Sequence, residues 1–168
     1  MQDSLIAFSQ MFAHDLGKLP AQKFFEPLSC FGAWMVTQFE GIPVWDVGAG
    51  MGHVSKELHE RGFQVCAIDI LQRDKNVYPV FAINGDSCGY TKGSVVMLCR
   101  PCHGYFPDSV IKQALKCKVG AIVYVGLPKN KRIDLGKYAK YFKSEMRKCG
   151  FDGESAYVWR MEYLKTGA

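Results

Sequence analysis

The chain has 168 residues, of which 48% are hydrophobic and 22% charged, and its formal net charge is +5. This is enough apolar sequence for one sizeable core, so we expect a single domain over residues 1–168. A transmembrane helix needs about 18 consecutive apolar residues, and this sequence has no apolar run of that length. The first residues also lack the pattern of a secretory signal. We therefore expect a cytoplasmic protein without a membrane partner.

Cysteines and charges narrow the class further. The 7 cysteines are an odd number and lie mostly within apolar runs, which favours reduced thiols over a disulfide framework. Residues 1–109 carry 8 Lys and Arg against 11 Asp and Glu, whereas residues 110–168 carry 13 against 5. A solvated helix face would account for this basic C-terminal third. The alternative that it raises is an anionic partner such as a nucleic acid.

Residues 1–40 have apolar side chains at helical spacing, interrupted between Gly17 and Pro20. They predict two helices that form an N-terminal cap, the second from near Pro20 to residues 39–41. Pro27 lies inside this second segment and is expected to kink or restart it, because proline lacks an amide donor.

From residue 43 onward, apolar runs alternate with helical segments. Several runs lack polar alternation, as strands buried on both faces do. This order predicts a doubly wound α/β sheet. The expected strands are 44–47, 64–68, 80–83, 94–99, 121–125 and 156–164, and the expected helices are 53–61, 108–117 and 135–149.

A glycine-rich turn follows the first strand. Gly48, Gly50 and Gly52 let the main chain approach a ligand closely, and the next helix begins with free amide donors and the positive end of its dipole. A dinucleotide fingerprint needs glycine where this chain has His53, so NAD and flavin dinucleotides are disfavoured.

The pattern Asp46-x-Gly48-x-Gly50-x-Gly52 instead resembles motif I of class I S-adenosylmethionine-dependent methyltransferases. Asp69 closes the second strand and matches the acid that binds the ribose hydroxyls in that family. Asp86 follows the third strand and matches the residue that meets the adenine amine. The resemblance covers about residues 44–127 and implies S-adenosylmethionine as the cofactor.

The resemblance also implies the site and the architecture. We expect a Rossmann-like three-layer α/β/α sandwich at residues 41–168, with a mostly parallel sheet of about six strands in the order 3-2-1-4-5 and a final strand beyond or beside the fifth. His53 is expected either to touch the methionine part of the cofactor or to be exposed. The implied cofactor-binding residues are Asp46, Gly48, Ala49, Gly50, Gly52, Asp69, Ile70, Asp86 and Ser87.

The segment Cys99–His103 ends the fourth strand, where the family places its substrate-facing motif. In amine-methylating members that motif reads Asn/Asp-Pro-Pro-aromatic, and here only Pro101 matches. Arginine is a donor only, so Arg100 cannot accept a hydrogen bond from an amine. The catalytic candidates are Arg100, as a clamp for a carboxylate or phosphate, and His103, as a base. Alternatively, Arg100 pairs with a structural carboxylate and His103 caps a loop.

The same segment spells Cys-x-x-Cys-His, which we do not interpret as haem attachment because no export signal precedes it. Zinc would need Cys99, Cys102, His103 and a distant Cys88, so no metal is predicted. A basic loop at 128–132 either attracts an anionic substrate or is simply solvated.

These features predict methyl transfer to an unidentified acceptor, which is a small molecule or a nucleic acid presented by a partner. Two alternatives remain. One is a cofactor-binding regulatory or subunit protein without transfer activity. The other is a nucleic-acid-binding module on a methyltransferase-like scaffold.

Overall fold

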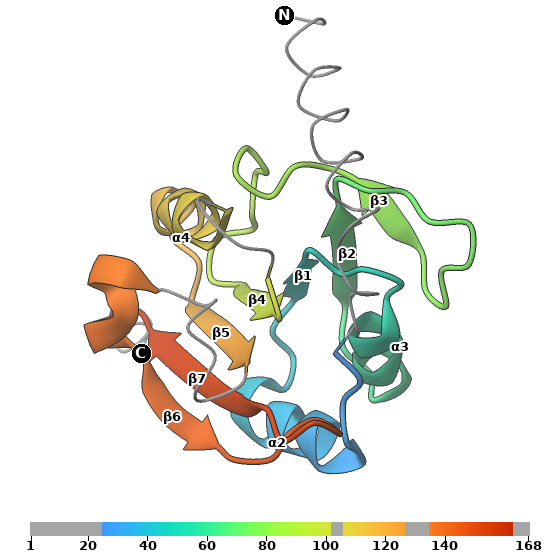
Figure 1. Ribbon diagram of the computed structural model, residues 1–168. Helices are drawn as coiled ribbons and strands as arrows, with labels where there is room; N and C mark the ends of the chain where they lie inside the picture. Colours follow the sequence, from blue (N-terminus) through green and yellow to red (C-terminus); the bar gives the residue numbers. More distant parts are fainter. Residues whose placement is uncertain (1–24, 102–105, 127–134, 163–168) are drawn as a thin grey trace, which may run out of the picture.

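The computed structural model describes residues 25–101, 106–126 and 135–162, which form a sheet covered by helices on both faces (Figure 1). The sheet has seven strands in the order β3-β2-β1-β4-β5-β7-β6. Its strands are β1 (Val44–Val47), β2 (Val65–Asp69), β3 (Val80–Ala82), β4 (Val95–Cys99), β5 (Ala121–Gly126), β6 (Lys143–Met146) and β7 (Ser155–Arg160). The helices are α2 (Ser29–Phe39), α3 (His53–Glu60) and α4 (Phe106–Lys116), with a 3-10 helix η1 (Gly136–Tyr141).

The first five strands are parallel and have the predicted order 3-2-1-4-5. β1 lies between β2 and β4, and every residue of β5 is buried. The order of the strands reverses between β1 and β4. In an open parallel sheet, ligands bind outside the carboxyl ends of the strands at this point.

The last part of the sheet corrects the prediction in two ways. There are seven strands instead of about six: β7 is the predicted final strand and lies antiparallel beside β5, whereas β6, which was not predicted, adds antiparallel to β7. The predicted helix over 135–149 is wrong: only the 3-10 helix η1 forms there, followed by β6. Leu135, Tyr138 and Phe142 have the spacing of a helical face, but they pack on the sheet from η1 and its flanks. β6 is an edge strand with exposed side chains, so it shows no apolar alternation.

Two apolar clusters, one on each face of the sheet, hold the layers together. Phe31, Met35 and Leu58 from α2 and α3 are fully buried against one face. Val110 and Ile111 from α4 are fully buried against the other face, where Tyr138 of η1 also packs. This is the predicted three-layer α/β/α sandwich. No helix in the described part of the chain is long and apolar enough to cross a membrane.

The segment before α2 is tied to the far end of the chain. Pro27 forms an isolated antiparallel bridge with Gly150, and the Leu28 amide donates to the carbonyl of Cys149 at 2.9 Å. Because Pro27 and Leu28 are extended, α2 begins at Ser29, as expected if Pro27 restarts the helix. The expected first helix and the start of the second lie outside the described residues.

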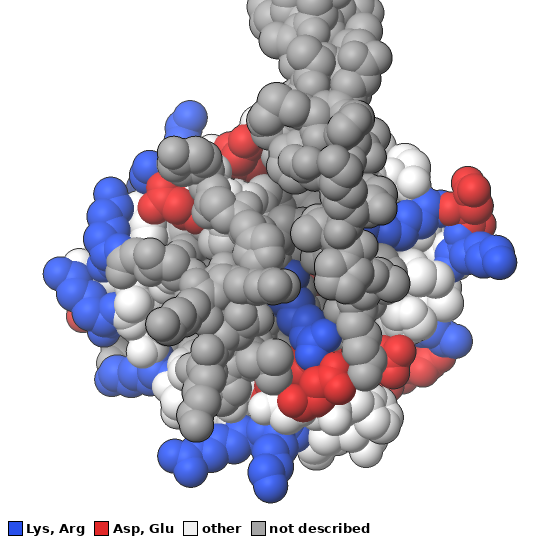
Figure 2. All heavy atoms as spheres, viewed as in Figure 1, with Lys and Arg blue, Asp and Glu red and all other residues white. Residues whose placement is uncertain are grey.

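The surface charge is uneven, as the sequence indicates. Figure 2, in the view of Figure 1, shows Lys and Arg side chains along the left and lower margins, where α4, η1 and β6 lie. Acidic side chains are present near α4 at the upper left, and the largest group of them lies in the lower centre of this face.

Candidate functional site

The site begins at the turn between β1 and α3. Gly48, Gly50 and Gly52 all have positive φ angles, of 71°, 61° and 85°. The amides of Gly48 and Ala49 donate to the carbonyl of Ile68 at 2.9 and 3.1 Å, which ties the turn to β2. All three glycines therefore meet a backbone requirement that other residues satisfy only with strain.

Gly52 meets a second requirement, because the loop before β3 packs directly on it. A Cβ atom at Gly52 would lie 2.8 Å from the Cβ of Tyr78. The same loop is fastened by the Val77 amide, which donates to the carbonyl of Met51 at 2.9 Å. The position of this third glycine is thus set by packing within the chain.

The carboxylate of Asp69 joins the end of β2 to the glycine turn. Its Oδ2 accepts a hydrogen bond from the Gly50 amide at 2.9 Å, and its Oδ1 accepts one from the Leu71 amide at 2.8 Å. Arg73 Nη1 lies 3.2 Å from Oδ2. Two groups that the sequence places 19 residues apart are therefore in direct contact.

Asp46 lies beneath the turn and is 2% exposed. Its Oδ2 accepts a hydrogen bond from Ser55 Oγ at 2.7 Å, which links β1 to the first turn of α3. Burial raises the pKa of Asp46 to about 6, and the nearby charge of Asp69 adds to the rise, whereas the hydrogen bonds from Ser55 oppose it. Asp46 is thus mostly ionised at pH 7.

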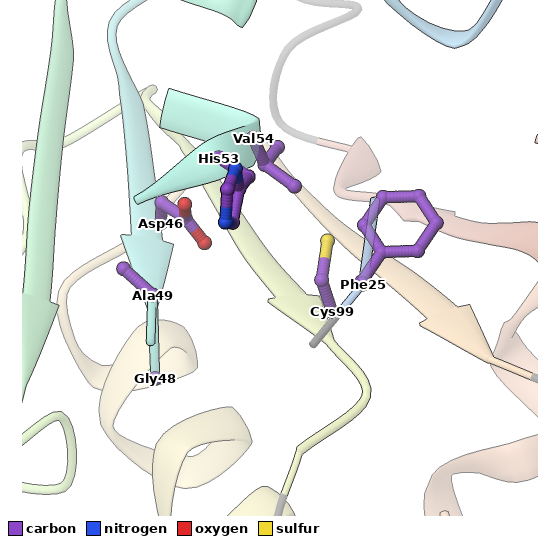
Figure 3. A pocket seen from close by; sticks show the side chains of 7 residues that line it. All are labelled: Phe25, Asp46, Gly48, Ala49, His53, Val54 and Cys99. Carbon is purple, nitrogen blue, oxygen red and sulfur yellow. The ribbon is translucent and has the colours of Figure 1, made fainter. Parts of the chain in front are cut away.

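A pocket opens between the turn and the end of β4, at the reversal of strand order. In Figure 3 the Asp46 carboxylate and the His53 ring lie on one side, and Cys99 and Phe25 lie toward the other. Burial strongly raises the pKa of the Cys99 thiol, so this group is neutral at pH 7. The lining residues are Phe25, Asp46, Gly48, Ala49, His53, Val54 and Cys99.

Cys99 begins the segment that the sequence analysis placed at the substrate-facing position, whereas Val54 and Phe25 were missed as site residues. Val54 carried a usable signal, because it follows the glycine turn. Phe25 had no local signal. It reaches the pocket because the bridge between Pro27 and Gly150 fixes the segment to which it belongs.

The other predicted cofactor residues do not line this pocket: Gly50, Gly52 and Asp69 belong to the turn and its contact with β2, and Ile70, Asp86 and Ser87 follow β2 and β3. Ile70 is 47% exposed and follows Asp69 directly. Asp86 and Ser87 are exposed in a turn. In this turn the Asp86 amide donates a hydrogen bond to Asn84 Oδ1 at 3.2 Å. Gly85 holds this turn against β1, since a Cβ there would lie 2.5 Å from Val47 Cγ1.

Arg100 follows β4 with a positive φ of 47°. Its Nη2 lies 2.9 Å from Asp152 Oδ2 and also pairs with Glu154, which is 1% exposed. This is the structural ion pair that the sequence left open as the alternative to an anion clamp. His103 and Cys102 lie outside the described residues, as does the basic loop at 128–132.

A metal site is not predicted by the sequence, and the described ranges contain no group of three or more His, Cys, Asp or Glu side chains that could hold an ion. Cys88 and Cys99 belong to different surroundings: Cys88 packs with the α4 face and Cys99 with the α2 face of the sheet.

No protein-family model and no curated protein matches the sequence. Solved structures do match. The magnesium protoporphyrin IX methyltransferase from Synechocystis PCC 6803 with bound SAM superposes with a TM-score of 0.56 at 17% identity, covering 77% of this chain and 75% of that one. A 23S rRNA methyltransferase gives a TM-score of 0.57 at 13% identity, covering 83% and 70%.

A third match is the 1,6-didemethyltoxoflavin-N1-methyltransferase from Burkholderia thailandensis with bound S-adenosylhomocysteine. Its TM-score is 0.54 at 15% identity, and the match covers 94% of this chain and 85% of that one. At such identities the likeness concerns the fold. The chain has the class I methyltransferase fold that its motifs resemble.

Proposed function

We propose that this chain binds S-adenosylmethionine and transfers its methyl group to an acceptor that is a small molecule or a nucleic acid presented by a partner. The observation that carries the proposal is the pocket between the glycine turn and the end of β4, at the point where the strand order reverses. Ligands of open α/β sheets bind there.

The residues around the turn suit the nucleoside part of this cofactor. Asp69 presents an anchored carboxylate at the end of β2, and carboxylate oxygens accept hydrogen bonds from a vicinal diol. Asp86 presents an exposed carboxylate for an exocyclic amine, and the exposed Ile70 offers an apolar surface to a base. The positive φ angles of Gly48, Gly50 and Gly52 fold the main chain into the tight turn at the edge of the pocket.

The pocket of Figure 3 suits the methionine part. The cofactor supplies a methyl group on a positively charged sulfur, so the chain needs mainly to orient the reactants. Asp46, mostly ionised at pH 7, offers negative charge to a cationic amino group. Cys99 stays protonated, and a neutral thiol competes poorly with the acceptor for the methyl group because the thiolate is the nucleophile.

Acceptor alignment is assigned to the segment after β4. We propose His103 as the base that removes a proton from the acceptor. Arg100 is paired with Asp152 and Glu154, which favours a positioning role for its guanidinium: it fixes the start of this segment against the loop between β6 and β7.

Calorimetric titration tests cofactor binding. We expect S-adenosylmethionine to bind and NAD to give no heat. Asp69→Asn should weaken binding of S-adenosylmethionine by about tenfold or more, since hydrogen bonds to a charged group contribute about 1.5–3 kcal/mol each. Asp74→Asn, which removes an exposed carboxylate from the loop before β3, is the matched control. Absence of binding to the unaltered chain would refute the proposal.

The second candidate is a cofactor-binding regulatory subunit, and the ion pair of Arg100 favours it because the charge is committed within the chain. Transfer of labelled methyl groups to RNA and to small-metabolite pools separates the two functions. The transferase predicts labelled product that His103→Ala reduces. Tight cofactor binding with no labelled product in any pool would instead support the regulatory function.

A further inference from the structure

The basic margin of the molecule contains a compact arrangement of lysines and aromatic rings that the proposed function does not use. Residues 137–148, which run from η1 through β6 into the following loop, carry five cations, namely Lys137, Lys140, Lys143, Arg147 and Lys148. All five are exposed. Glu145, the one acidic residue in this interval, is paired with Arg160 at 2.8 Å. The interval is therefore a concentrated positive surface at the edge of the sheet.

An exposed aromatic ring lies within this charge. Tyr141 is 44% exposed and stacks on Trp159 of β7, with ring centroids 4.5 Å apart and planes 10° from parallel. Trp159 is itself fixed by Phe142 and Tyr138, at centroid distances of 5.8 and 5.9 Å. Tyr141 is thus a rigid ring, held from below, that still offers surface to a ligand.

The lysines lie next to the rings and not merely nearby in sequence. Lys140 Nζ is 5.1 Å from the Tyr141 ring centroid, and Lys137 Nζ is 5.2 Å from that of Tyr138. A flat group that stacked on Tyr141 would take the place of the Lys140 ammonium group over the ring, and this ammonium group could then pair with the charge attached to the flat group. An anionic chain with flat rings at regular intervals matches this arrangement.

We infer that η1 forms a docking surface for single-stranded nucleic acid at this edge of the sheet, in which an unpaired base stacks on Tyr141 while Lys137 and Lys140 contact the flanking phosphates. Base stacking on an aromatic side chain tolerates any sequence, because every base has a flat face. A duplex hides those faces inside its own stack, so only the phosphate contacts would remain for it. An acidic protein segment would match the charge but would leave the Tyr141 ring without a partner.

The docking surface lies at a distance from the pocket between the glycine turn and the end of β4. β6 is four strand spacings from β1 in the sheet, which is about 20 Å at about 4.8 Å per spacing. A strand held at this edge would thus need several nucleotides to reach the glycine turn. Binding at the surface requires neither the cofactor nor transfer activity, so it is independent of the proposed function.

Fluorescence anisotropy with a labelled single-stranded RNA 20-mer, without cofactor, tests the inference. The matched single-stranded DNA and the duplex serve as further ligands. We expect both single strands to bind more tightly than the duplex. Tyr141→Ala should weaken single-strand binding by about tenfold or more and leave duplex binding unchanged, whereas Tyr141→Phe should retain binding because the ring remains.

The charge contribution is tested separately, so that the outcome does not depend on how well Tyr141→Ala folds. Lys140→Gln should reduce the slope of log affinity against log salt by about 0.7 for a single strand. Lys75→Gln, an exposed lysine in the loop between β2 and β3, is the matched control and should not change the slope.

Three results would overturn the inference: no binding at 100 mM salt, equal affinity for duplex and single strand, or equal loss of binding with Lys75→Gln and Lys140→Gln. Displacement of the RNA by polyglutamate as readily as by unlabelled RNA would point to an acidic protein partner instead. Failure of any of these tests leaves the titration with S-adenosylmethionine unaffected.

Discussion

Gly52 in the glycine turn lacks a side chain for two reasons, its backbone conformation and its packing, and comparison with Gly41 separates the two. Gly41 and Gly52 have similar positive φ angles, of 76° and 85°. Nothing lies within 4 Å of a Cβ built on Gly41, whereas one built on Gly52 meets Tyr78. The two positions share the conformational requirement and differ in the packing requirement, so a pair of alanine substitutions separates the two effects.

We expect Gly52→Ala to lower the free energy of unfolding by about 3 kcal/mol, from left-handed strain together with the clash against Tyr78. Gly41→Ala should lower it by only about 1 kcal/mol, from strain alone. Urea denaturation followed by circular dichroism measures both. Equal losses would mean that the loop before β3 moves away from the turn without cost.

Asp46 makes stability depend on pH in an unusual direction for a carboxylate. Its pKa rises from 3.8 to about 6 on folding, so the folded chain binds this proton more tightly than the unfolded chain. The contribution is complete below pH 4 and is lost as the pH rises through 6.

Asp46→Asn removes the titrating carboxyl group and keeps an oxygen that can accept the hydrogen bond from the Ser55 hydroxyl. When the pH rises from about 4.5 to about 7.5, the free energy of unfolding of the unaltered chain should fall by about 2 kcal/mol relative to that of the variant. Denaturation with urea at the two pH values gives the difference, and Asp74→Asn controls for the change in net charge. A gain for the unaltered chain over this interval would contradict the raised pKa.

At the level of elements, the sequence predicted β1 to β5, α3 and α4 because the order of apolar and polar residues in each one matches the way that it is buried. Every residue of β5 is buried, and its run of apolar residues shows this directly. β6 was missed because its side chains are exposed and its partner is a strand that comes later in the chain. No local pattern records such a pairing.

The loop between β6 and β7 is attached to the end of β4 through Arg100, which pairs with both Asp152 and Glu154. Glu154 is buried and Arg100 is 18% exposed, so removal of Arg100 leaves the charge of Glu154 uncompensated inside the protein. Arg160, by contrast, pairs with Glu145 at a surface where its side chain is 39% exposed.

Arg100→Gln should therefore lower the free energy of unfolding by about 3 kcal/mol. Arg160→Gln should lower it by about 1 kcal/mol or less. The double variant with Arg100→Gln and Glu154→Gln should lose less than the sum of the two single variants. Additive losses in that double-mutant cycle would show that the two side chains do not stabilise each other.

At the scale of the whole molecule, each buried strand of the sheet contributes side chains to both apolar clusters. Neighbouring residues of β4 alternate between them, with Met97 on the α2 face and Leu98 on the α4 face. Neither cluster can form without the sheet. The single domain therefore remains our prediction, and it implies that both faces unfold together.

Met35→Ala and Ile111→Ala probe the α2 face and the α4 face, where both side chains are 0% exposed. Each should lower the free energy of unfolding by about 2–4 kcal/mol and shift one common transition. Tryptophan fluorescence and circular dichroism should report the same midpoint in both variants. Separate midpoints would show that the faces unfold independently.

The candidate site was predictable where it is local and not where it is assembled from distant segments. The glycine turn and Asp69 could be located because the turn and the strand end each have their own sequence pattern, and their contact follows from the parallel pairing of β1 with β2. The partners of Arg100 lie more than 50 positions away, on a hairpin whose first strand was missed.

The bridge between Pro27 and Gly150 affects the order in which the molecule is assembled. Closing a loop of this length carries an entropic cost that must be met before the contact contributes any stability, and such distant contacts slow folding. Phe25 can settle beside Cys99 only after the last hairpin has formed. During synthesis, the chain would therefore expose the glycine turn long before the opposite wall of the pocket exists, and tight ligand capture would wait until residues near 150 have left the ribosome.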